Sequence, residues 1–230
     1  MQTLLSIGND SKTVKGEKYG VLTGIVYLAP SFESGINTCF DASPECIKLC
    51  LFTSGRGGMR PVHEARVKKT LSLFREKRAF LSKLVEEITA LVRKAAKEGK
   101  VPAIRLNGTS DLPWERVRLD GKSLMEMFPA VQFYDYTKSE SRMFDFLLGK
   151  MPANYHMTFS RSENNEASCA RVLTLKGNVA AVFSKMPKRF LGARVVSGDD
   201  SDLRFLDPAG VVVGLTPKGK AKKSTGGFVV

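Results

Sequence analysis

Short apolar segments that end in polar turns recur through the chain, and this pattern limits its fold more than any other feature. Each segment is rich in β-branched, aromatic or small apolar residues, and most lead into loops of Asn, Gly, Ser, Thr or Asp. The segments cover residues 19–29, 103–106, 131–136, 155–159, 179–183, 194–196, 203–206 and 211–215. Near-continuous apolar strands separated by crossover segments are typical of a parallel sheet.

Helical patterns lie between these segments. From residue 63 to residue 100, apolar side chains recur every three or four positions among Lys, Arg and Glu, as on the buried face of a helix. Residues 121–128 and 139–149 are further candidate helices. The alternation predicts an α/β protein with a mostly parallel sheet, arranged like a partial (β/α) barrel of the TIM-barrel kind.

No repeat, low-complexity tract or long linker divides the 230 residues, so we expect a single domain over residues 1–230. Within it we distinguish a Cys-rich loop at residues 31–62 and a basic C-terminal tail at residues 216–225. No apolar run reaches the roughly 18 to 20 residues that a membrane-spanning helix needs, and the N-terminus lacks the pattern of a secretory signal. We therefore expect no membrane association and a cytoplasmic location.

Three of the four cysteines are clustered in the sequence, as Cys39-x6-Cys46-x3-Cys50. Clustered thiols in a polar, Pro-containing loop are a poor disulfide framework and favour a metal site in a reduced protein. Three thiolates without a nearby fourth fit a [4Fe–4S] cluster with one open iron, which a further ligand can occupy. Zinc is the alternative if Cys169, His63 or His156 supplies the fourth ligand through the fold.

Polar side chains follow four of the predicted strands. In a parallel α/β sheet the carboxyl ends of the strands share one edge, where ligands bind. We therefore expect the Cys-rich loop to lie at this edge beside the residues that follow the later strands. These candidates are Asn107, Thr109, Ser110, Asp111, Tyr136, Lys138, Ser160, Arg161 and Glu163. Among them, Tyr136, Lys138 and Glu163 are expected to line a substrate pocket.

The formal net charge of +13 is concentrated in two parts of the chain. Residues 56–100 contain 13 basic and 5 acidic side chains. The tail adds four lysines, which are Lys218, Lys220, Lys222 and Lys223. Basic side chains on a helix and a tail can neutralise phosphates without reading the base sequence, so we expect a nucleic acid or a nucleotide as partner.

Several segments, taken in order, resemble the uncharacterised phage and mobile-element family called gene product 88. They are CFDASPECIKLCLFTSGRGGMRPVHEARVKKTLSLF from Cys39 onward, IRLNGTSDLPWE, VQFYDYTKS, NYHMTFSRSE and LRFLDPAGVVVGLTPKGKAKKSTGGFVV. The resemblance covers most of the chain and implies a phage or plasmid origin in a bacterial host. It implies no particular biochemical activity.

A cysteine triad after a first strand, followed by an α/β chain, is also similar to the radical S-adenosylmethionine enzymes, which hold a [4Fe–4S] cluster in a partial barrel. This similarity implies that Cys39, Cys46 and Cys50 bind the cluster and that S-adenosylmethionine binds its open iron. It further implies that a turn binds the amino group of this cofactor, formed by Asn107, Thr109, Ser110 and Asp111. Ser160 and Arg161 would suit its ribose or carboxylate.

Two functions from different classes follow from these patterns. The first is a radical S-adenosylmethionine-like iron–sulfur enzyme that acts on or binds nucleic acid or a nucleotide. The second is a non-catalytic nucleic-acid-binding protein whose cysteines are free or hold a structural zinc. No pattern in the sequence identifies the substrate, the reaction, the catalytic residues, the role of Cys169 or the oligomeric state.

Overall fold

The computed structural model describes residues 2–8 and 11–230. Within these residues nine strands form one sheet, in the order β1-β2-β3-β4-β5-β6-β9-β8-β7. The strands are β1 (Leu5–Ile7), β2 (Val21–Val26), β3 (Val101–Arg105), β4 (Gln132–Thr137), β5 (Tyr155–Ser160), β6 (Val179–Val182), β7 (Arg189–Phe190), β8 (Ala193–Ser197) and β9 (Val212–Leu215). In this spatial order, each strand from β2 across to β8 is parallel to its neighbour. The edge pairs β1–β2 and β7–β8 are antiparallel. The prediction of an α/β protein with a mostly parallel sheet is confirmed.

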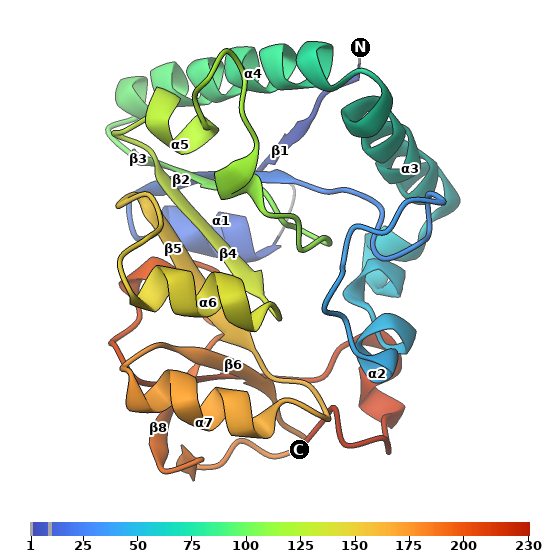
Figure 1. Cartoon of the computed structure of the whole chain (residues 1–230), viewed down its shortest axis with the longest axis vertical. Helices are drawn as coiled ribbons and strands as arrows, with labels where there is room; N and C mark the ends of the chain where they lie inside the picture. Colours follow the sequence, from blue (N-terminus) through green and yellow to red (C-terminus); the bar gives the residue numbers. More distant parts are fainter. Residues whose placement is uncertain (1, 9–10) are drawn as a thin grey trace.

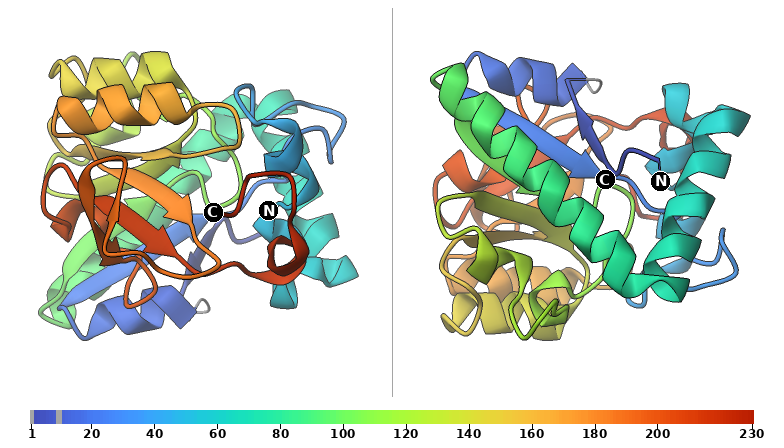
Figure 2. Two further views of the ribbon diagram at one scale, coloured as in Figure 1. Left: turned by 90° about the horizontal axis from the view of Figure 1, so that it is seen from below. Right: turned by 90° about the horizontal axis from the view of Figure 1, so that it is seen from above.

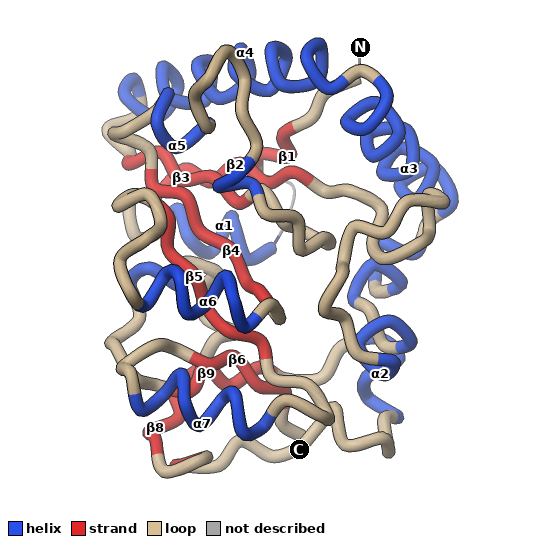
Figure 3. The backbone as a smooth tube through the Cα atoms, in the orientation of Figure 1, coloured by secondary structure: helices blue, strands red, loops and turns tan. Residues whose placement is uncertain are grey.

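Consecutive strands from β1 to β6 are neighbours, so the chain crosses this part of the sheet in one direction (Figures 1 and 3). The order changes after β6, because β9 pairs with β6 on one side and with β8 on the other. In the described part of the chain, β1 and β7 are the two edges of an open sheet that does not close into a barrel.

Helices and short helical turns connect the strands. The α-helices are α1 (Ser11–Glu17), α2 (Pro44–Lys48), α3 (Arg60–Arg75), α4 (Lys77–Lys97), α5 (Leu124–Met127), α6 (Glu140–Leu147) and α7 (Glu166–Thr174). The 3-10 turns are η1 (Leu51–Thr53), η2 (Gly55–Gly58), η3 (Trp114–Arg116), η4 (Arg204–Leu206) and η5 (Gly219–Lys223). The predicted helix over residues 63–100 is two helices, because the backbone of Glu76, with φ −128° and ψ 46°, interrupts it.

Three strand assignments differ from the expectation. Residues 203–206 were expected to form a strand, and this is wrong, because Leu203 packs on the sheet beside Val21 and Tyr134 while the next three residues form η4. The segment covers a face of the sheet instead of extending it. Strands β1 and β7 were not expected from the sequence, because three and two residues are too few to show a periodicity.

Both faces of the sheet are covered. Figure 2 shows α6 and α7 on one face and α1 on the other. The larger core joins α4, Met143 of α6 and Val172 of α7 to the strand side chains that face them. The other face carries a smaller apolar cluster and a buried ion pair, in which Arg105 Nη1 lies 2.8 Å from Asp202 Oδ2.

The carboxyl ends of β2 to β6 share one edge of the sheet, and the Cys-rich loop lies there. The loop after β3 is tied to it by a hydrogen bond from Asp111 N to the Thr38 carbonyl at 2.8 Å. The C-terminal segment returns to the same edge, where Val230 N donates to the Val182 carbonyl at 2.9 Å. On its way the segment runs beside α2 (Figures 1 and 2).

Candidate functional site

All three clustered cysteines line one small cavity at the carboxyl edge of the sheet. Cys39, Cys46 and Cys50 share it with Glu33 and Phe52, and Pro30, Ser31, Ala42 and Ile47 complete its wall. We call this cavity the thiol pocket. The four cysteines of the chain are free, so the fold gathers the clustered thiols without joining them in a disulfide.

Local hydrogen bonds hold the three cysteines in place. The backbone N–H of Cys39 donates to the side chain of Asn37 at 3.0 Å. Ser43 is the N-cap of α2, and its Oγ accepts a hydrogen bond from Cys46 N at 3.2 Å. Cys50 follows the end of α2 and is the residue from which η1 begins. One short helix and two turns therefore place three cysteines around one pocket.

Burial determines the protonation of two of these thiols. It raises the pKa of the Cys39 thiol, and it raises the pKa of the Cys50 thiol to about 11. Both thiols are therefore protonated at neutral pH in the metal-free protein. A metal ion that bound here would displace these protons, because the thiolate is the ligand.

The expected fourth ligands lie in different places. Cys169 is buried on α7 in the larger core, and His156 on β5 packs against Phe146 with ring centroids 5.4 Å apart. His63 is beside the thiol pocket, since its Nε2 lies 3.0 Å from a carboxylate oxygen of Glu33 and its ring lies 5.9 Å from that of Phe52. Over residues 2–8 and 11–230, no three His, Cys, Asp or Glu side chains are arranged to hold a metal ion.

The turn after β3 is held by its own hydrogen bonds. The side-chain oxygen of Asn107 accepts from Ser110 Oγ at 2.9 Å, Leu112 N at 2.9 Å and Trp114 Nε1 at 3.2 Å. Thr109 Oγ1 donates to the Leu28 carbonyl. The Thr109 carbonyl lies 3.8 Å from Cys39 Sγ, so the turn contacts the thiol pocket through its backbone.

Asp111 belongs to a buried charge network. It accepts hydrogen bonds from Arg142 and, at 2.8 Å, from Lys138 N. Arg142 also binds both carboxylate oxygens of Glu115, at 3.0 and 2.9 Å. Neither Glu115 nor Arg142 was expected from the sequence, where the only available signal was a charged residue, Arg142, among the apolar positions of the predicted helix over residues 139–149.

Three candidates that follow β4 and β5 meet the C-terminal segment. Arg161 Nη1 donates to the carbonyls of Gly227 and Phe228 at 2.6 and 3.1 Å. Lys138 Nζ lies 5.4 Å from the centre of the Phe228 ring. Glu163 lies against Gly227, where an added Cβ atom would be 3.6 Å from the Glu163 Cβ. It also accepts hydrogen bonds from Ser43 Oγ and from Glu45 N in the first turn of α2. These side chains therefore connect the strand ends, the tail and the helix that carries Cys46.

Tyr136 and Ser160 are placed differently. Tyr136 lies on the face of the sheet that carries the smaller apolar clusters, with its hydroxyl 3.3 Å from Asp202 and the Arg105 guanidinium 4.7 Å from its ring centre. Ser160 is half-buried at the end of β5, and its carbonyl accepts from Asn165 at 3.0 Å. Tyr136 is thus separated from Lys138 and Glu163, with which the sequence grouped it.

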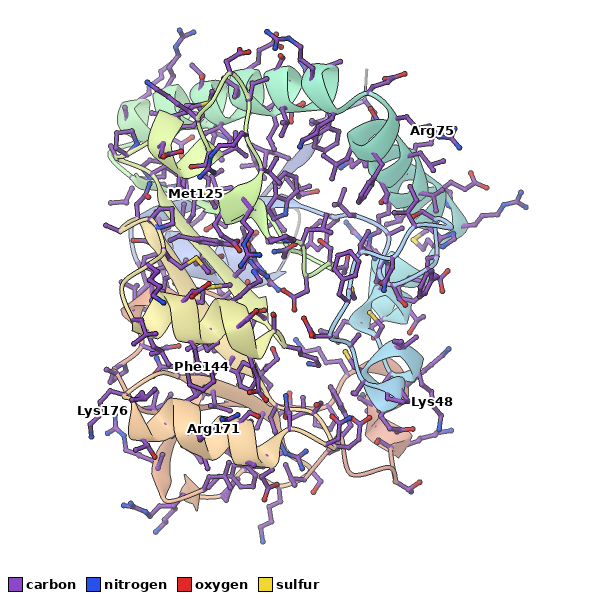
Figure 4. The ribbon with its side chains drawn as sticks, in the orientation of Figure 1. Lys48, Arg75, Met125, Phe144, Arg171 and Lys176 are labelled. Atoms are coloured by element: carbon purple, nitrogen blue, oxygen red, sulfur yellow. The ribbon has the colours of Figure 1, made fainter. Side chains whose placement is uncertain are left out.

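The basic C-terminal tail lies beside the thiol pocket. The turn η5, which carries three of the tail lysines, contacts η1, and Gly219 lies directly against Ser54. Figure 4 shows Lys48 on α2 and Arg75 at the end of α3 pointing outward on the same side of the molecule. This side therefore carries positive charge from segments far apart in the sequence.

Among the described residues no helix is both long and apolar enough to cross a bilayer.

The fold and the site define a class: a mixed α/β protein with a cysteine-lined pocket at the carboxyl edge of its sheet. The chain belongs to the gene product 88 (GP88) family, whose family model matches residues 3–230. This confirms the family resemblance expected from the sequence. No curated protein and no solved structure matches the chain, so the comparisons give no support to the more distant similarity to radical S-adenosylmethionine enzymes.

Proposed function

We propose that Cys39, Cys46 and Cys50 bind a [4Fe–4S] cluster and that the protein is an iron–sulfur protein. The observation that carries this proposal is that three free thiols line one pocket. They are not arranged to hold a metal ion in the metal-free protein, so cluster binding would have to draw them together. Soft thiolates are the ligands that iron–sulfur clusters take. The pocket lies where ligands bind in parallel α/β sheets.

A cluster is favoured over structural zinc by the ligand set. Structural zinc takes four protein ligands, and neither Cys169 nor His156 lines the pocket. His63 is the remaining candidate, but its Nε2 faces Glu33. Three thiolates leave one iron of a [4Fe–4S] cluster open to a further ligand.

S-adenosylmethionine is the further ligand in the enzymatic version of this proposal. The one-way order of β2 to β6 supports it, because this is the strand order of a partial barrel. The turn after β3 supports it less, because the side chains of Asn107, Ser110 and Asp111 are already hydrogen-bonded within the protein. Cofactor binding at Arg161 would require the tail to release it.

Nucleic acid is the partner that we propose for the basic side of the molecule. The proposal is favoured by the contact between η5 and η1, which adds the tail lysines to the charge beside the thiol pocket. Exposed lysines and arginines bind phosphates by releasing counterions. Nucleic-acid binding is compatible with both an iron–sulfur enzyme and a non-catalytic binding protein.

Metal and sulfide analysis of anaerobically purified and reconstituted protein tests the cluster. We expect about four iron and four sulfide per chain and a brown colour, both lost in Cys46→Ser. The matched control is Cys169→Ser, which removes a thiol outside the pocket and is expected to keep the cluster. A colourless protein with one zinc, or equal iron in the two variants, would overturn the proposal.

S-adenosylmethionine binding is measured separately on the reconstituted protein by its effect on the electron paramagnetic resonance spectrum of the reduced cluster. A changed spectrum supports the enzymatic version. An unchanged spectrum leaves an iron–sulfur protein whose open iron takes a different ligand.

A further inference from the structure

Arg66 on α3 differs from the other buried arginines of the chain. In the described structure, the other three arginines that are more than nine-tenths buried each have a carboxylate oxygen within 4 Å: Arg142 has Glu115, Arg161 has Glu166 and Arg204 has Asp207. Arg66 is 9% exposed, and no described carboxylate pairs with it. Its Nε and Nη1 atoms are buried without a hydrogen-bond partner.

A buried guanidinium without a counter-ion is unfavourable, because burial removes the water that stabilises its charge. The Arg66 guanidinium lies 5.1 Å from the centre of the Tyr27 ring, which offsets part of this cost. The other group that would act favourably on it is Cys50, which lines the thiol pocket, once its thiol is ionised. Arg66 does not itself line the pocket, but its Nη2 atom is separated from the carbonyl of Phe52, a residue of the pocket wall, by Gly57. Two of its donor atoms are unused.

The surrounding backbone holds the guanidinium in this place. A Cβ atom at Gly57 would lie 3.3 Å from Arg66 Nη2 and 2.7 Å from the Phe52 carbonyl. The glycine thus lets η2 pack closely between the arginine and η1. This close packing of η2 requires a glycine at position 57, and it keeps the Arg66 guanidinium close to the loop that carries Cys50.

We propose that Arg66 is the buried counter-charge of the thiol pocket and that the pocket takes an anionic occupant. The proposal rests on the proposed function, because three thiolates outweigh the charge of an oxidised [4Fe–4S] core and leave the centre net negative. Arg66 is a positioning residue that does not ligate the metal. Its unused donors offset the negative charge of the sulfurs.

The first test reconstitutes the protein anaerobically with Fe(II) and sulfide. We expect Arg66→Gln to lose its cluster to a chelator roughly tenfold faster than the wild type, equivalent to about 1.4 kcal/mol. Its reduction potential should become more negative, because removing a positive charge makes addition of an electron harder. Arg66→Lys should retain most of the wild-type behaviour.

The matched control for this test is Lys68→Gln. It removes the same charge from the same helix at an exposed position, so it should change neither the cluster loss nor the potential. Equal potentials and equal cluster loss in the wild type and Arg66→Gln would overturn the proposal.

The second test uses metal-free protein and separates this proposal from the proposed function. In a Cys169→Ser background, alkylation of Cys50 by anionic iodoacetate is compared with alkylation by neutral iodoacetamide, with the site identified by mass spectrometry. Both reagents react with the same thiolate, so the rate ratio does not depend on how much of the thiol is ionised. We expect the ratio to fall several-fold in Arg66→Gln and to be kept in Arg66→Lys.

Cys39 is the internal control, because Asp111 and Cys46 are the ionisable groups that act on its thiol, and Arg66 is not among them. Its rate ratio should be the same in all variants. If the wild type takes up no cluster but the ratio at Cys50 falls in Arg66→Gln, the proposed function fails and the anionic pocket stands. An unchanged ratio at Cys50 overturns the counter-charge, whatever the metal content.

Discussion

Glu163, on the loop after β5, accepts a hydrogen bond from Ser43 Oγ at 2.7 Å, 120 positions earlier in the chain. Its other carboxylate oxygen accepts from the backbone N–H of Glu45 at 3.1 Å. One side chain therefore satisfies two donors at the start of α2, whose first turn includes Cys46. The position of this cysteine depends on a carboxylate from a distant strand end.

Replacing Glu163 tests this dependence. We expect Glu163→Gln to lower the free energy of unfolding by roughly 1–2 kcal/mol, because it weakens charge-assisted hydrogen bonds, and to raise the reactivity of Cys46 toward a thiol reagent. Although partial burial opposes it, the hydrogen bonds from Ser43 and the backbone lower the pKa of Glu163. The effect of the substitution should therefore shrink as the pH falls below about 4.

Urea unfolding and thiol labelling measure these two effects. The control is Glu86→Gln, which changes an exposed carboxylate on α4 that pairs with Lys83. If Glu163→Gln and Glu86→Gln have equal unfolding free energies and equal Cys46 reactivity, the link between β5 and α2 does not position the cysteine.

Asp135 should make the stability depend on pH near neutrality. Burial raises its pKa to about 7 although Arg105 opposes this, whereas an unfolded chain has an Asp pKa of about 3.9. The protonated Asp135 carboxyl therefore stabilises the folded protein fully below pH about 4, and this contribution is lost as the pH rises through 7. Urea unfolding at several pH values from 4 to 8 should show a weaker decline for Asp135→Asn than for the wild type. Parallel curves would contradict the raised pKa.

His156 should affect the stability at lower pH and with the opposite pH dependence to Asp135, so that stability is lost as the pH falls. Burial, with a smaller effect from Arg204, lowers its pKa to about 4. Its neutral form contributes stability above pH about 6.5, and this contribution falls by roughly 1.4 kcal/mol per pH unit until the pH reaches about 4. We expect His156→Phe to unfold at a lower pH than the wild type in an acid titration followed by near-ultraviolet circular dichroism. An unchanged midpoint would exclude His156 from the acid transition.

The tail lysines should control nucleic-acid affinity. Changing Lys220 and Lys222 to Gln should weaken binding of single-stranded DNA and reduce the slope of log affinity against log salt by up to about 1.4, or about 0.7 per phosphate contact. The control changes Lys122 and Lys150, which are exposed on loops leading into the opposite edge of the sheet. Fluorescence anisotropy at several salt concentrations measures both pairs. Equal slopes for the two pairs would indicate that net charge alone is responsible.

The sequence predicted the strands of the sheet best where they are most buried. Phe133, Met157 and Val179 belong to runs in which apolar side chains face both layers of the protein, and such runs are visible without knowledge of the fold. The break at Glu76 is a change of backbone conformation at a single residue, which helical periodicity does not record. The return of Gly227 and Phe228 to Arg161 joins residues more than sixty positions apart, and no local pattern indicates it.

The candidate site was predicted only in part, because local patterns are visible in the sequence and contacts between distant segments are not. The cysteine spacing is local, and it identified three side chains that share a pocket. Arg66 and Arg142 look like ordinary basic residues in helical segments, and only the fold buries them. Their partners, or the absence of a described carboxylate partner for Arg66, depend on contacts between segments that the sequence does not pair.

The enclosure of the thiol pocket has a consequence for the newly made protein. The three cysteines of the pocket lie in the first quarter of the chain, yet α2 is held by Glu163 and by a contact between Glu45 and Ser224, 179 positions away. During translation the three thiols therefore leave the ribosome long before the residues that secure their loop. Oxidants and metal ions in the cell reach these thiols first while that loop is still unsecured.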